Sequence, residues 1–312
     1  MKTALVTGGA GFIGSHLIAR LLKGNNKVIC VDNLTLGTKE NISDFIGDDS
    51  FIFYEADISS IKDTIEILRK HSVDSIFHLA ANSDIQMSSK YPDIDYRNTF
   101  STTYSVLECM RQLSIKKLFF ASTSAVYGDQ PGINLSETVG SLLPISYYGG
   151  AKLASEAFTS VYSYMNNLDV SIFRFPNVIG PSLTHGVVFD FIQKLQKDNT
   201  VLDILGDGTQ HKPYIYIDDL LDAILLVSLS DEKGMHIYNA GVEGTTSVKE
   251  IADMVCAKLG LHNVTYRYSG GNRGWKGDVP TFQYDLTKIH GRGWKAVYNS
   301  NQAVQATLDK LL

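Results

Sequence analysis

A tyrosine and a lysine four residues apart are the residues of this sequence best placed to do chemistry together. They lie in the run "SYYGGAKLASE", residues 146–156, where Tyr148 and Lys152 would share one face of a helix while Tyr147 would point elsewhere. A phenol is a poor base at neutral pH, but a nearby ammonium, aided by a second positive charge, favours its ionised form. Tyr148 is therefore a candidate general base, although the same spacing is common in helices that carry no chemistry.

Three hydroxyl side chains precede this pair. Ser122, Thr123 and Ser124 follow the apolar run "KLFFAS" and would lie at the carboxyl edge of a parallel sheet, where ligands of such folds bind. A hydroxyl at that edge can hydrogen-bond the substrate oxygen whose proton Tyr148 removes. Strand-end capping and turn formation are the ordinary roles of such hydroxyls and suffice for two of the three.

The run "LVTGGAGFIGSHL" near the start indicates a dinucleotide site. Gly8, Gly11 and Gly14 follow an apolar strand and open a helix, and without Cβ atoms they permit a tight turn and close approach of the backbone to a pyrophosphate. Asp32 ends the second strand about 20 residues later, where a carboxylate can hydrogen-bond a ribose 2′-hydroxyl and would repel a 2′-phosphate. The pattern predicts NAD, in preference to NADP, as the cofactor.

The elements that would hold these residues alternate regularly through the first half of the chain. Short apolar runs predict buried strands, and longer segments between them have apolar residues at helical spacing. The predicted strands cover 3–8, 27–33, 51–57, 75–81, 117–123 and 170–176, and the predicted helices cover 14–24, 63–71 and 102–113. Alternation of this kind is typical of an α/β fold with a Rossmann-type, doubly wound parallel sheet.

After Pro176 the pattern loosens. Residues 206–213 read as a loop, 214–229 restore a strand and a helix, and 246–312 hold two helix-like segments around "GGNRGWKGDVP". We expect residues 1–176, with a return segment at about 214–240, to form an NAD-binding domain. Residues 177–213 and 241–312 would form a smaller, interleaved C-terminal substrate lobe.

Composition limits the other function classes. The 312 residues have a net charge of −5 and are 44% apolar, which argues against a general attraction to nucleic acid or membranes. The three cysteines lie far apart, outside any CxxC motif or His-rich segment, so neither disulfides nor a metal site is indicated. The first residues run directly into a strand, with no leader-like segment. We expect a cytoplasmic protein.

Short motifs that recur in order over nearly the whole chain resemble those of the extended short-chain dehydrogenase/reductase family, in its NAD-dependent nucleotide-sugar epimerase and dehydratase branch. They are "TGGAGFIGSHL", "VDNL", "ADI", "FHLAA", "NT", "STSAVYG", "YGGAKLASE", "RFPNVIGP", "GDGTQHKPYIYIDD" and "RGWKGDV". The resemblance implies that Thr123, Tyr148 and Lys152 form the catalytic group. Among the three hydroxyls it selects Thr123, which lies four residues before Tyr127 of "VYG".

The resemblance also implies the ligand contacts. For a tightly bound NAD these are Gly8, Gly11, Phe12, Ile13, Gly14, Asp32, Asn33, Asp57, Ile58, Leu79, Ala80, Ala81, Asn98, Ser122, Tyr148, Lys152 and Pro176. For a nucleotide sugar they are Ser83, Ser124, Asn177, Val187, Lys212, Tyr214, Arg273 and Asp278, with Lys212 and Arg273 near the pyrophosphate.

Some of these positions depart from the family pattern or allow another role. Lys212-Pro213 stands where much of the family has Arg-Asp, and a lysine cannot give the bidentate grip of an arginine. Ser83 and Asp84 fit a turn and a helix cap equally well. We expect His185 to lie in a surface loop.

The resemblance implies a shared first step, in which Tyr148 removes a proton from a sugar hydroxyl while hydride passes to NAD, giving a 4-keto sugar. Dehydratases of the branch carry Asp-Glu directly after the catalytic threonine, and decarboxylating relatives carry a carboxylate where this chain has Ala125. Ser124-Ala125 therefore disfavours both reactions.

Three functions stay open on the sequence. The resemblance favours a nucleotide-sugar 4-epimerase of the UDP-glucose 4-epimerase kind. A C4 dehydrogenase that stops at the 4-keto sugar and retains NADH would use the same residues, and a non-catalytic NAD-binding regulator would be expected to lack part of the group that is complete here. The family also implies a homodimer through the helices at 99–113 and 148–166.

Overall fold

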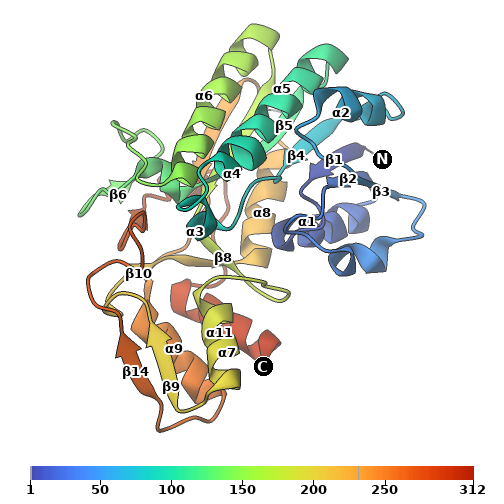
Figure 1. Ribbon diagram of the computed structural model, residues 1–312. Helices are drawn as coiled ribbons and strands as arrows, with labels where there is room; N and C mark the ends of the chain where they lie inside the picture. The colour runs from blue at the N-terminus through green and yellow to red at the C-terminus, as the bar shows by residue number, and fades with distance from the viewer. Residues whose placement is uncertain (1, 231) are drawn as a thin grey trace. The chain divides into compact units, whose positions relative to one another are not determined.

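A computed structural model describes residues 2–230 and 232–312 (Figure 1). Its α-helices are α1 (Phe12–Lys23), α2 (Ile61–Leu68), α3 (Ile85–Ser88), α4 (Asp93–Asp95), α5 (Thr102–Leu113), α6 (Tyr147–Asn166), α7 (Val187–Lys197), α8 (Ile217–Ser228), α9 (Val248–Lys258), α10 (Thr287–His290) and α11 (Ser300–Leu311). Two 3₁₀-helices, η1 (Lys39–Phe45) and η3 (Ser124–Tyr127), and a π-helix, η2 (Tyr96–Ser101), complete the helical elements.

The strands are β1 (Thr3–Thr7), β2 (Lys27–Asp32), β3 (Phe51–Glu55), β4 (Ser75–His78), β5 (Lys117–Thr123), β6 (Asn134–Leu135), β7 (Asp169–Phe175), β8 (Asn177–Ile179), β9 (Val201–Ile204), β10 (His211–Lys212), β11 (Tyr214–Tyr216), β12 (Met235–Asn239), β13 (Thr246–Ser247), β14 (Thr265–Tyr268) and β15 (Gln283–Tyr284). The chain divides into two compact units. The first unit comprises Met1–Val126, Ser146–Arg174 and Ile224–Tyr238, and the second comprises Tyr127–Ile145, Phe175–Ala223 and Asn239–Leu312.

The first unit is built on a seven-stranded sheet in the order β12-β7-β5-β4-β1-β2-β3. The neighbours β3 and β2, β2 and β1, β1 and β4, and β4 and β5 pair in parallel. The order reverses between β1 and β4, and ligands of such sheets bind at the carboxyl ends of the strands flanking this switch point. The predicted strands and helices are all present, and the Rossmann-type α/β fold is confirmed.

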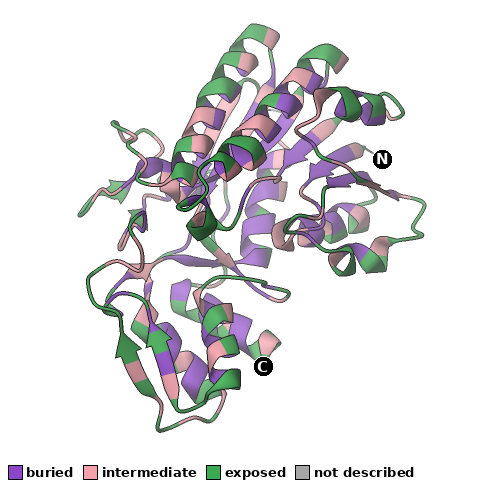
Figure 2. Ribbon diagram, in the orientation of Figure 1, coloured by how far each residue is buried: buried purple, intermediate pink, exposed green. Residues whose placement is uncertain are grey.

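The core of this unit is an apolar layer between the sheet and the helices α2, α5 and α6. Ile65 of α2, Leu107 of α5 and Phe120 of β5 are among its buried members. In Figure 1, α5 and α6 run side by side, and Tyr162 of α6 donates a 2.5 Å hydrogen bond to Glu108 of α5. Figure 2 shows the sheet mostly in purple and much of the outward sides of both helices in green.

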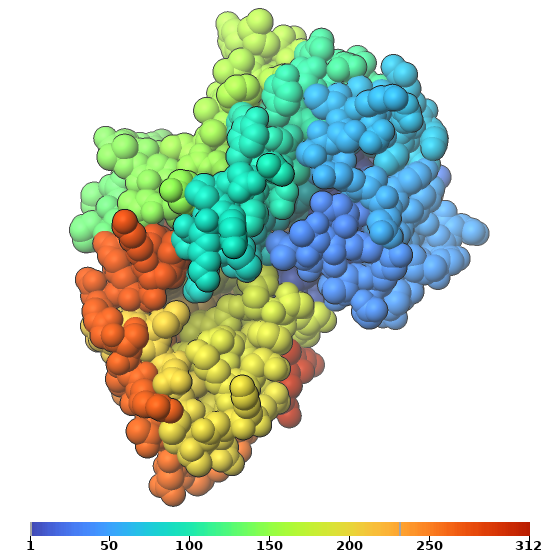
Figure 3. Space-filling model, viewed as in Figure 1, coloured from blue at the N-terminus to red at the C-terminus, as the bar shows by residue number. Residues whose placement is uncertain are grey.

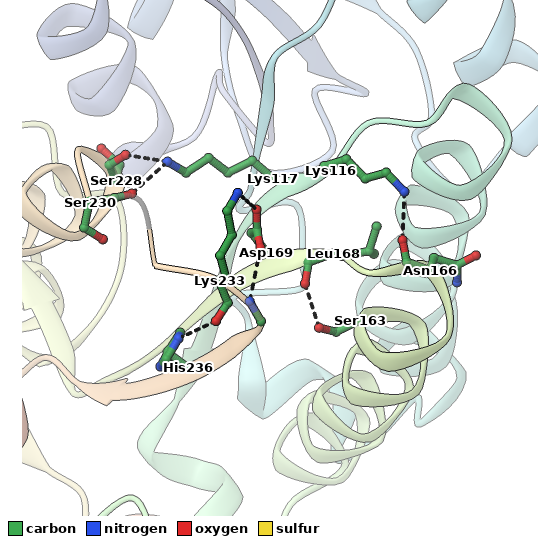
Figure 4. Close-up of polar contacts among 11 residues, drawn as sticks. Lys116, Lys117, Ser163, Asn166, Leu168, Asp169, Ser228, Ser230, Lys233 and His236 are labelled. Carbon is green, nitrogen blue, oxygen red and sulfur yellow. Dashed lines mark hydrogen bonds and ion pairs between the residues drawn. The ribbon is translucent and has the colours of Figure 1, made fainter.

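Two lysine side chains at the amino end of β5 hydrogen-bond the ends of neighbouring helices (Figure 4). At the start of β5, Lys117 Nζ donates to the carbonyl oxygens of Ser228 and Ser230, 2.8 and 3.2 Å away, at the end of α8. Its neighbour Lys116 donates to the carbonyl of Asn166 at the end of α6, at 2.8 Å. Cations favour helix carboxyl ends because the last carbonyl groups carry partial negative charge. The two lysines at the start of β5 therefore cap the carboxyl ends of α6 and α8.

The second unit combines helices with two-stranded sheets. β8 pairs with β11, β9 with β14 and β6 with β15 in parallel, while β10 and β13 pair antiparallel. Two expectations need correction here. The predicted loop at 206–213 contains the short strand β10, because the chain there pairs with β13, and residues after 246 form three helices instead of two. The extra one, α10, is only four residues long, too short to give a periodic signal.

Two further observations concern the described residues as a whole. Within residues 2–230 and 232–312, no helix is long and apolar enough to cross a membrane. The cysteines Cys30, Cys109 and Cys256 are all buried and unbridged.

Candidate active site

Tyr148 and Lys152 lie on the first two turns of α6. The helix begins at Tyr147 because Ser146 caps it, with its hydroxyl accepting a hydrogen bond from the Gly149 amide at 3.1 Å. Lys152 is 2% exposed, and its Nζ lies 5.9 Å from the centre of the Tyr148 ring. Tyr147, by contrast, is 56% exposed. The predicted pairing of Tyr148 with Lys152, and the different direction of Tyr147, are confirmed.

Burial governs the protonation of this pair. The Tyr148 side chain is half-buried. The protein atoms packed around it desolvate the phenol, and this burial raises the pKa of Tyr148 above the usual value. The Asp95 carboxylate raises the Tyr148 pKa further, while a hydrogen bond with Thr123 lowers it. Burial also lowers the pKa of Lys152 to about 7, against the opposing effect of Glu156 and Asp95.

Lys152 alone therefore does not ionise Tyr148, and the predicted ionisation still needs the second positive charge. Burial lowers the pKa of Lys152, which favours the neutral amine, and it raises the pKa of Tyr148, which favours the neutral phenol. The ammonium therefore does not offset the effect of burial on the Tyr148 pKa. Lys152 Nζ instead donates a 2.6 Å hydrogen bond to the Ala121 carbonyl and lies 4.9 Å from the centre of the Phe120 ring. These contacts fix the lysine beneath the end of β5.

The three hydroxyls at the end of β5 have different partners. Thr123, the last residue of the strand, accepts a hydrogen bond from the Ala125 amide at 3.2 Å, and its hydroxyl lies near enough to Tyr148 to lower the pKa of the tyrosine. Ser122 donates a 2.5 Å hydrogen bond to Glu156, which Arg174 grips through Nε at 3.0 Å and through Nη2 at 2.5 Å. Ser124 begins η3. Sequence reasoning missed Glu156 and Arg174, although the quoted motifs "YGGAKLASE" and "RFPNVIGP" contain them.

The glycine turn leaves no room for side chains. A Cβ on Gly8, which has a φ of +70°, would lie 2.8 Å from the Ala80 nitrogen, and one on Gly14 would lie 2.3 Å from the Gly8 oxygen. Gly11 precedes α1 without a side-chain cap, and the first turn of α1 has no acidic residue. The free amides of that turn therefore suit an anionic group, and the backbone cradle fits a pyrophosphate.

Asp32 completes the dinucleotide geometry. It ends β2 and is 8% exposed, with Oδ2 accepting from the Ala10 amide at 2.9 Å and Oδ1 from the Leu34 amide at 2.8 Å. Burial raises its pKa and these backbone donors lower it. Each carboxylate oxygen can accept a second hydrogen bond, so the donors of a ribose fit beside it. The residues of this turn and strand end thus fit NAD.

The other predicted NAD contacts lie in the first unit, apart from Pro176. Phe12 and Ile13 are in the first turn of α1, and Asn33 follows β2. Asp57 and Ile58 follow β3, Leu79, Ala80 and Ala81 follow β4, and Asn98 lies in the π-helix η2. Helices of this kind are rare and occur often at functional sites. Most of these positions are strand ends of one sheet edge, as the Rossmann topology requires. Pro176 belongs to the second unit.

The second unit brings three of the predicted substrate residues together. Lys212 forms an ion pair with Asp278, and Arg273 Nη1 donates a 2.6 Å hydrogen bond to the Asp278 carbonyl. Arg273 also pairs with Asp129, which sequence reasoning missed. Asp278 is fixed in turn by the Gly274 amide, 3.0 Å from its Oδ2. Two cations and two carboxylates thus form one partly exposed cluster.

The remaining predicted substrate residues are scattered. Asn177 is exposed at the start of β8, Tyr214 is buried at the start of β11, and Val187 begins α7. In the first unit Ser83 is exposed beside Asp84, which caps α3 by accepting from the Met87 amide at 3.0 Å. The capping interpretation of Asp84 therefore holds. His185 is exposed, as expected.

A Rossmann-type sheet, a glycine turn with an acidic strand end, and a Thr-Tyr-Lys group define an NAD-dependent enzyme of the extended short-chain dehydrogenase/reductase type. Residues 4–241 match the NAD dependent epimerase/dehydratase family, and the chain belongs to this family.

Three known proteins show how similar this chain is to other members of the family. A putative UDP-glucose 4-epimerase of Methanocaldococcus jannaschii is 32% identical over 98% of this chain and 97% of its own length. A crystal structure of a UDP-galactose 4-epimerase, 32% identical, covers 99% of this chain and 98% of that one with a TM-score of 0.88. A dTDP-glucose 4,6-dehydratase of Streptomyces venezuelae, solved with NAD bound, is 27% identical over 99% of this chain and 96% of its own, with a TM-score of 0.90.

Proposed function

We propose that this protein is an NAD-dependent nucleotide-sugar 4-epimerase that interconverts a UDP-sugar and its C4 epimer. The observation that carries the proposal is the meeting of Thr123, Tyr148 and Lys152 at the carboxyl end of β5. Family membership and the epimerase names of the relatives support the same reaction.

Each residue of the group has a proposed role. Thr123 holds the C4 oxygen of the sugar by a hydrogen bond, and Tyr148 takes the hydroxyl proton and later returns it. Because burial keeps the Tyr148 phenol protonated, it becomes a base only when a bound ligand adds positive charge to that of Lys152. NAD, held by the glycine turn and Asp32, supplies hydride transfer when bound. The chain's task is to hold the sugar and move the proton.

We distinguish epimerase from dehydratase by the side chains beside Thr123, because similarity of the whole fold does not separate the two enzymes. The two solved structures above superpose on this chain equally well, with TM-scores of 0.88 and 0.90. Dehydration needs further acid and base groups beside the sugar, and the residues after Thr123 are Ser124 and Ala125, neither of which titrates. An epimerase needs no further acid or base. It only returns hydride to the opposite face of C4 and the proton to the C4 oxygen.

We assign the dinucleotide to the first unit and the nucleotide end of the substrate to the second. Lys212 and Arg273 carry the charge that a diphosphate requires, in a protein whose net charge of −5 gives no general attraction. Arg and Lys form charge-assisted hydrogen bonds with phosphate oxygens, so a diphosphate would compete with their present carboxylate partners, Asp278 and Asp129.

We also propose a homodimer through α5 and α6. The side chains that α6 buries are small or polar, whereas its outward side is apolar, an inversion that suits a partner surface. The exposed apolar residues of the two helices are Tyr104, Tyr147, Phe158, Val161, Tyr164 and Met165, and Figure 3 shows the surface over α5 and α6 in teal and yellow-green. A cytoplasmic location agrees with three unbridged cysteines.

The function is tested by mixing NAD-loaded protein with UDP-glucose, UDP-galactose and related UDP- and GDP-sugars while recording absorbance at ~340 nm, where NADH absorbs. NMR of the sugar products follows. The expected result is a C4-inverted UDP-sugar with little lasting NADH. A stable rise in absorbance with a 4-keto product and no inversion would show a C4 dehydrogenase instead.

A further inference from the structure

A buried carboxylate that the proposed mechanism does not use lies next to the Tyr148–Lys152 pair. Asp95, the last residue of α4, is 1% exposed. Its Oδ1 accepts hydrogen bonds from Asn82 Nδ2 at 2.9 Å and from the Thr99 hydroxyl at 3.4 Å. Its Oδ2 is buried and has no hydrogen-bond partner in the described part of the chain. A buried carboxylate that is only half satisfied is costly, and such groups persist where their charge has a use.

The packing brings this carboxylate to the candidate active site. α4 and the π-helix η2 both pack against α6, within the first unit. The charge of Asp95 acts on two side chains of α6, Tyr148 and Lys152, and on both it favours the protonated form.

The other charged or titratable groups around the pair are ion-paired, neutral or exposed to solvent. On α6, Glu156 is held by Arg174 of β7 in a two-pronged ion pair with both side chains at most 5% exposed. His78 of β4 is neutral near pH 7, because burial lowers its pKa to about 3. On the surface side, the cap residue of α3, Asp84, is exposed, and Asp93 of α4 pairs with Arg97 in solvent. Lys152 is left with Asp95 as the one nearby buried charge, among the described residues, that is not otherwise neutralised.

We propose that Asp95 is the counter-ion of Lys152 and a positioning residue for the proton transfer at Tyr148. The second half of this statement rests on the proposed function, and the first half does not. A buried ammonium without a counter-ion gives up its proton, so the carboxylate preserves the charge that assists ionisation of the phenol. Asp95 also raises the pKa of Tyr148 directly, so the phenol ionises only when a ligand supplies more positive charge.

The test compares Asp95→Asn, which keeps the shape and removes the charge, with the wild type. Removing a negative charge lowers the pKa of every neighbouring acid, so Lys152 and Tyr148 both shift in the same direction. We expect Lys152 to titrate about one pH unit lower in the variant. Both limbs of the pH profile of kcat should also move to lower pH. A purely structural role would lower kcat at every pH and leave the profile where it is.

The Lys152 titration is read by NMR of protein labelled with ¹³C at the lysine side chains, with the Lys152 resonance identified by its loss in Lys152→Met. Asp93→Asn, a change of the same kind at an exposed site on the same helix, is the control and should leave the titration unchanged. Asp95→Glu keeps the charge and should restore the wild-type titration even where its longer side chain lowers the thermal midpoint.

The outcomes are distinct. Lys152 titrating at the same pH in Asp95→Asn and in the wild type would overturn the counter-ion role. A shifted titration with an unshifted pH profile would overturn the role in proton transfer. If the wild type turns over no nucleotide sugar, the proposed function fails, while the lysine titration still decides the counter-ion.

Discussion

The two groups of charged residues in this protein are held in opposite ways. In the first unit the Glu156–Arg174 pair and Lys152 are almost completely buried, with exposures of 5% or less. In the second unit Lys212 and Arg273 are 20% and 34% exposed, and of their carboxylate partners Asp129 is 27% exposed and Asp278 is buried. Both groups contain ion pairs, but only the second is open to exchange with solvent ions.

The difference decides what each group can do. Buried charges interact strongly and shift one another's pKa, so the first unit sets protonation states in advance. Partly exposed ion pairs are weak and screened, so a ligand can replace their partners at small cost. The buried group suits proton transfer and the exposed group suits binding. Variants in the first unit should therefore change kcat, and variants in the second should change KM.

The largest effect is expected for Tyr148→Phe. Removing the hydroxyl removes the proposed base, which is worth about 100- to 10,000-fold, so kcat should fall by about a thousandfold. Bound NAD should stay at the wild-type level, because the glycine turn and Asp32 are unchanged. The measurement is turnover of a UDP-sugar together with the NAD content of the purified protein.

Tyr147→Phe is the matched control for this variant. Its ring is exposed and points away from Lys152, so turnover should stay within about twofold of the wild type. Equal losses in both variants would place the effect in the start of α6 and not in the Tyr148 hydroxyl.

A second, smaller effect concerns stability and pH. The ordinary pKa of a lysine is 10.5, and burial lowers that of Lys152 to about 7. Below pH 7 the ammonium is charged in both the folded and the unfolded state, and the folded state bears the full cost of burying it. Between these two pKa values the unfolded chain binds more protons, so the free energy of unfolding should rise with pH, by at most about 1.4 kcal/mol per pH unit.

Lys152→Met should remove this rise, because methionine does not titrate. Urea denaturation at about pH 7 and about pH 9, below the range where unfolded tyrosines ionise, measures the free energy of unfolding of both proteins. The free energy of unfolding of the wild type should rise relative to that of the variant as the pH increases. A constant difference would mean that Lys152 is not desolvated as its burial implies.

Local sequence patterns were enough for the frame of the first unit. The strands, the glycine turn and the four-residue spacing of Tyr148 and Lys152 each depend on neighbours along the chain, and the structure has them as predicted. The same holds for Asp32, whose position follows from a strand end. Patterns of this length report backbone geometry and burial, which determine the fold class.

Partners from distant segments could not be read in this way. Asp95 reaches the candidate site only because α4 packs on α6, and Glu156 meets Arg174 only because β7 lies behind that helix. The protonation state of Tyr148 depends on the folded structure in the same way. A spacing indicates that an ammonium is near, but only the folded environment shows that desolvation outweighs its charge.

The smallest effect, and the one that bears most directly on the second unit, is expected for Lys212→Met. If the cation cluster binds the diphosphate, loss of one charge should raise KM for the UDP-sugar by about tenfold and leave kcat nearly unchanged. Added salt should raise KM in the wild type and less so in the variant, because the charge being screened is already absent.

Lys249→Met is the control. Lys249 also lies in the second unit and also pairs with an aspartate, Asp253, but this ion pair is exposed on α9 and shares no residue with the cluster. Its replacement should change neither constant. Should Lys212→Met lower kcat at an unchanged KM, the cation would act on the reaction itself, and the division between a unit that sets protonation and a unit that binds charge would have to be abandoned.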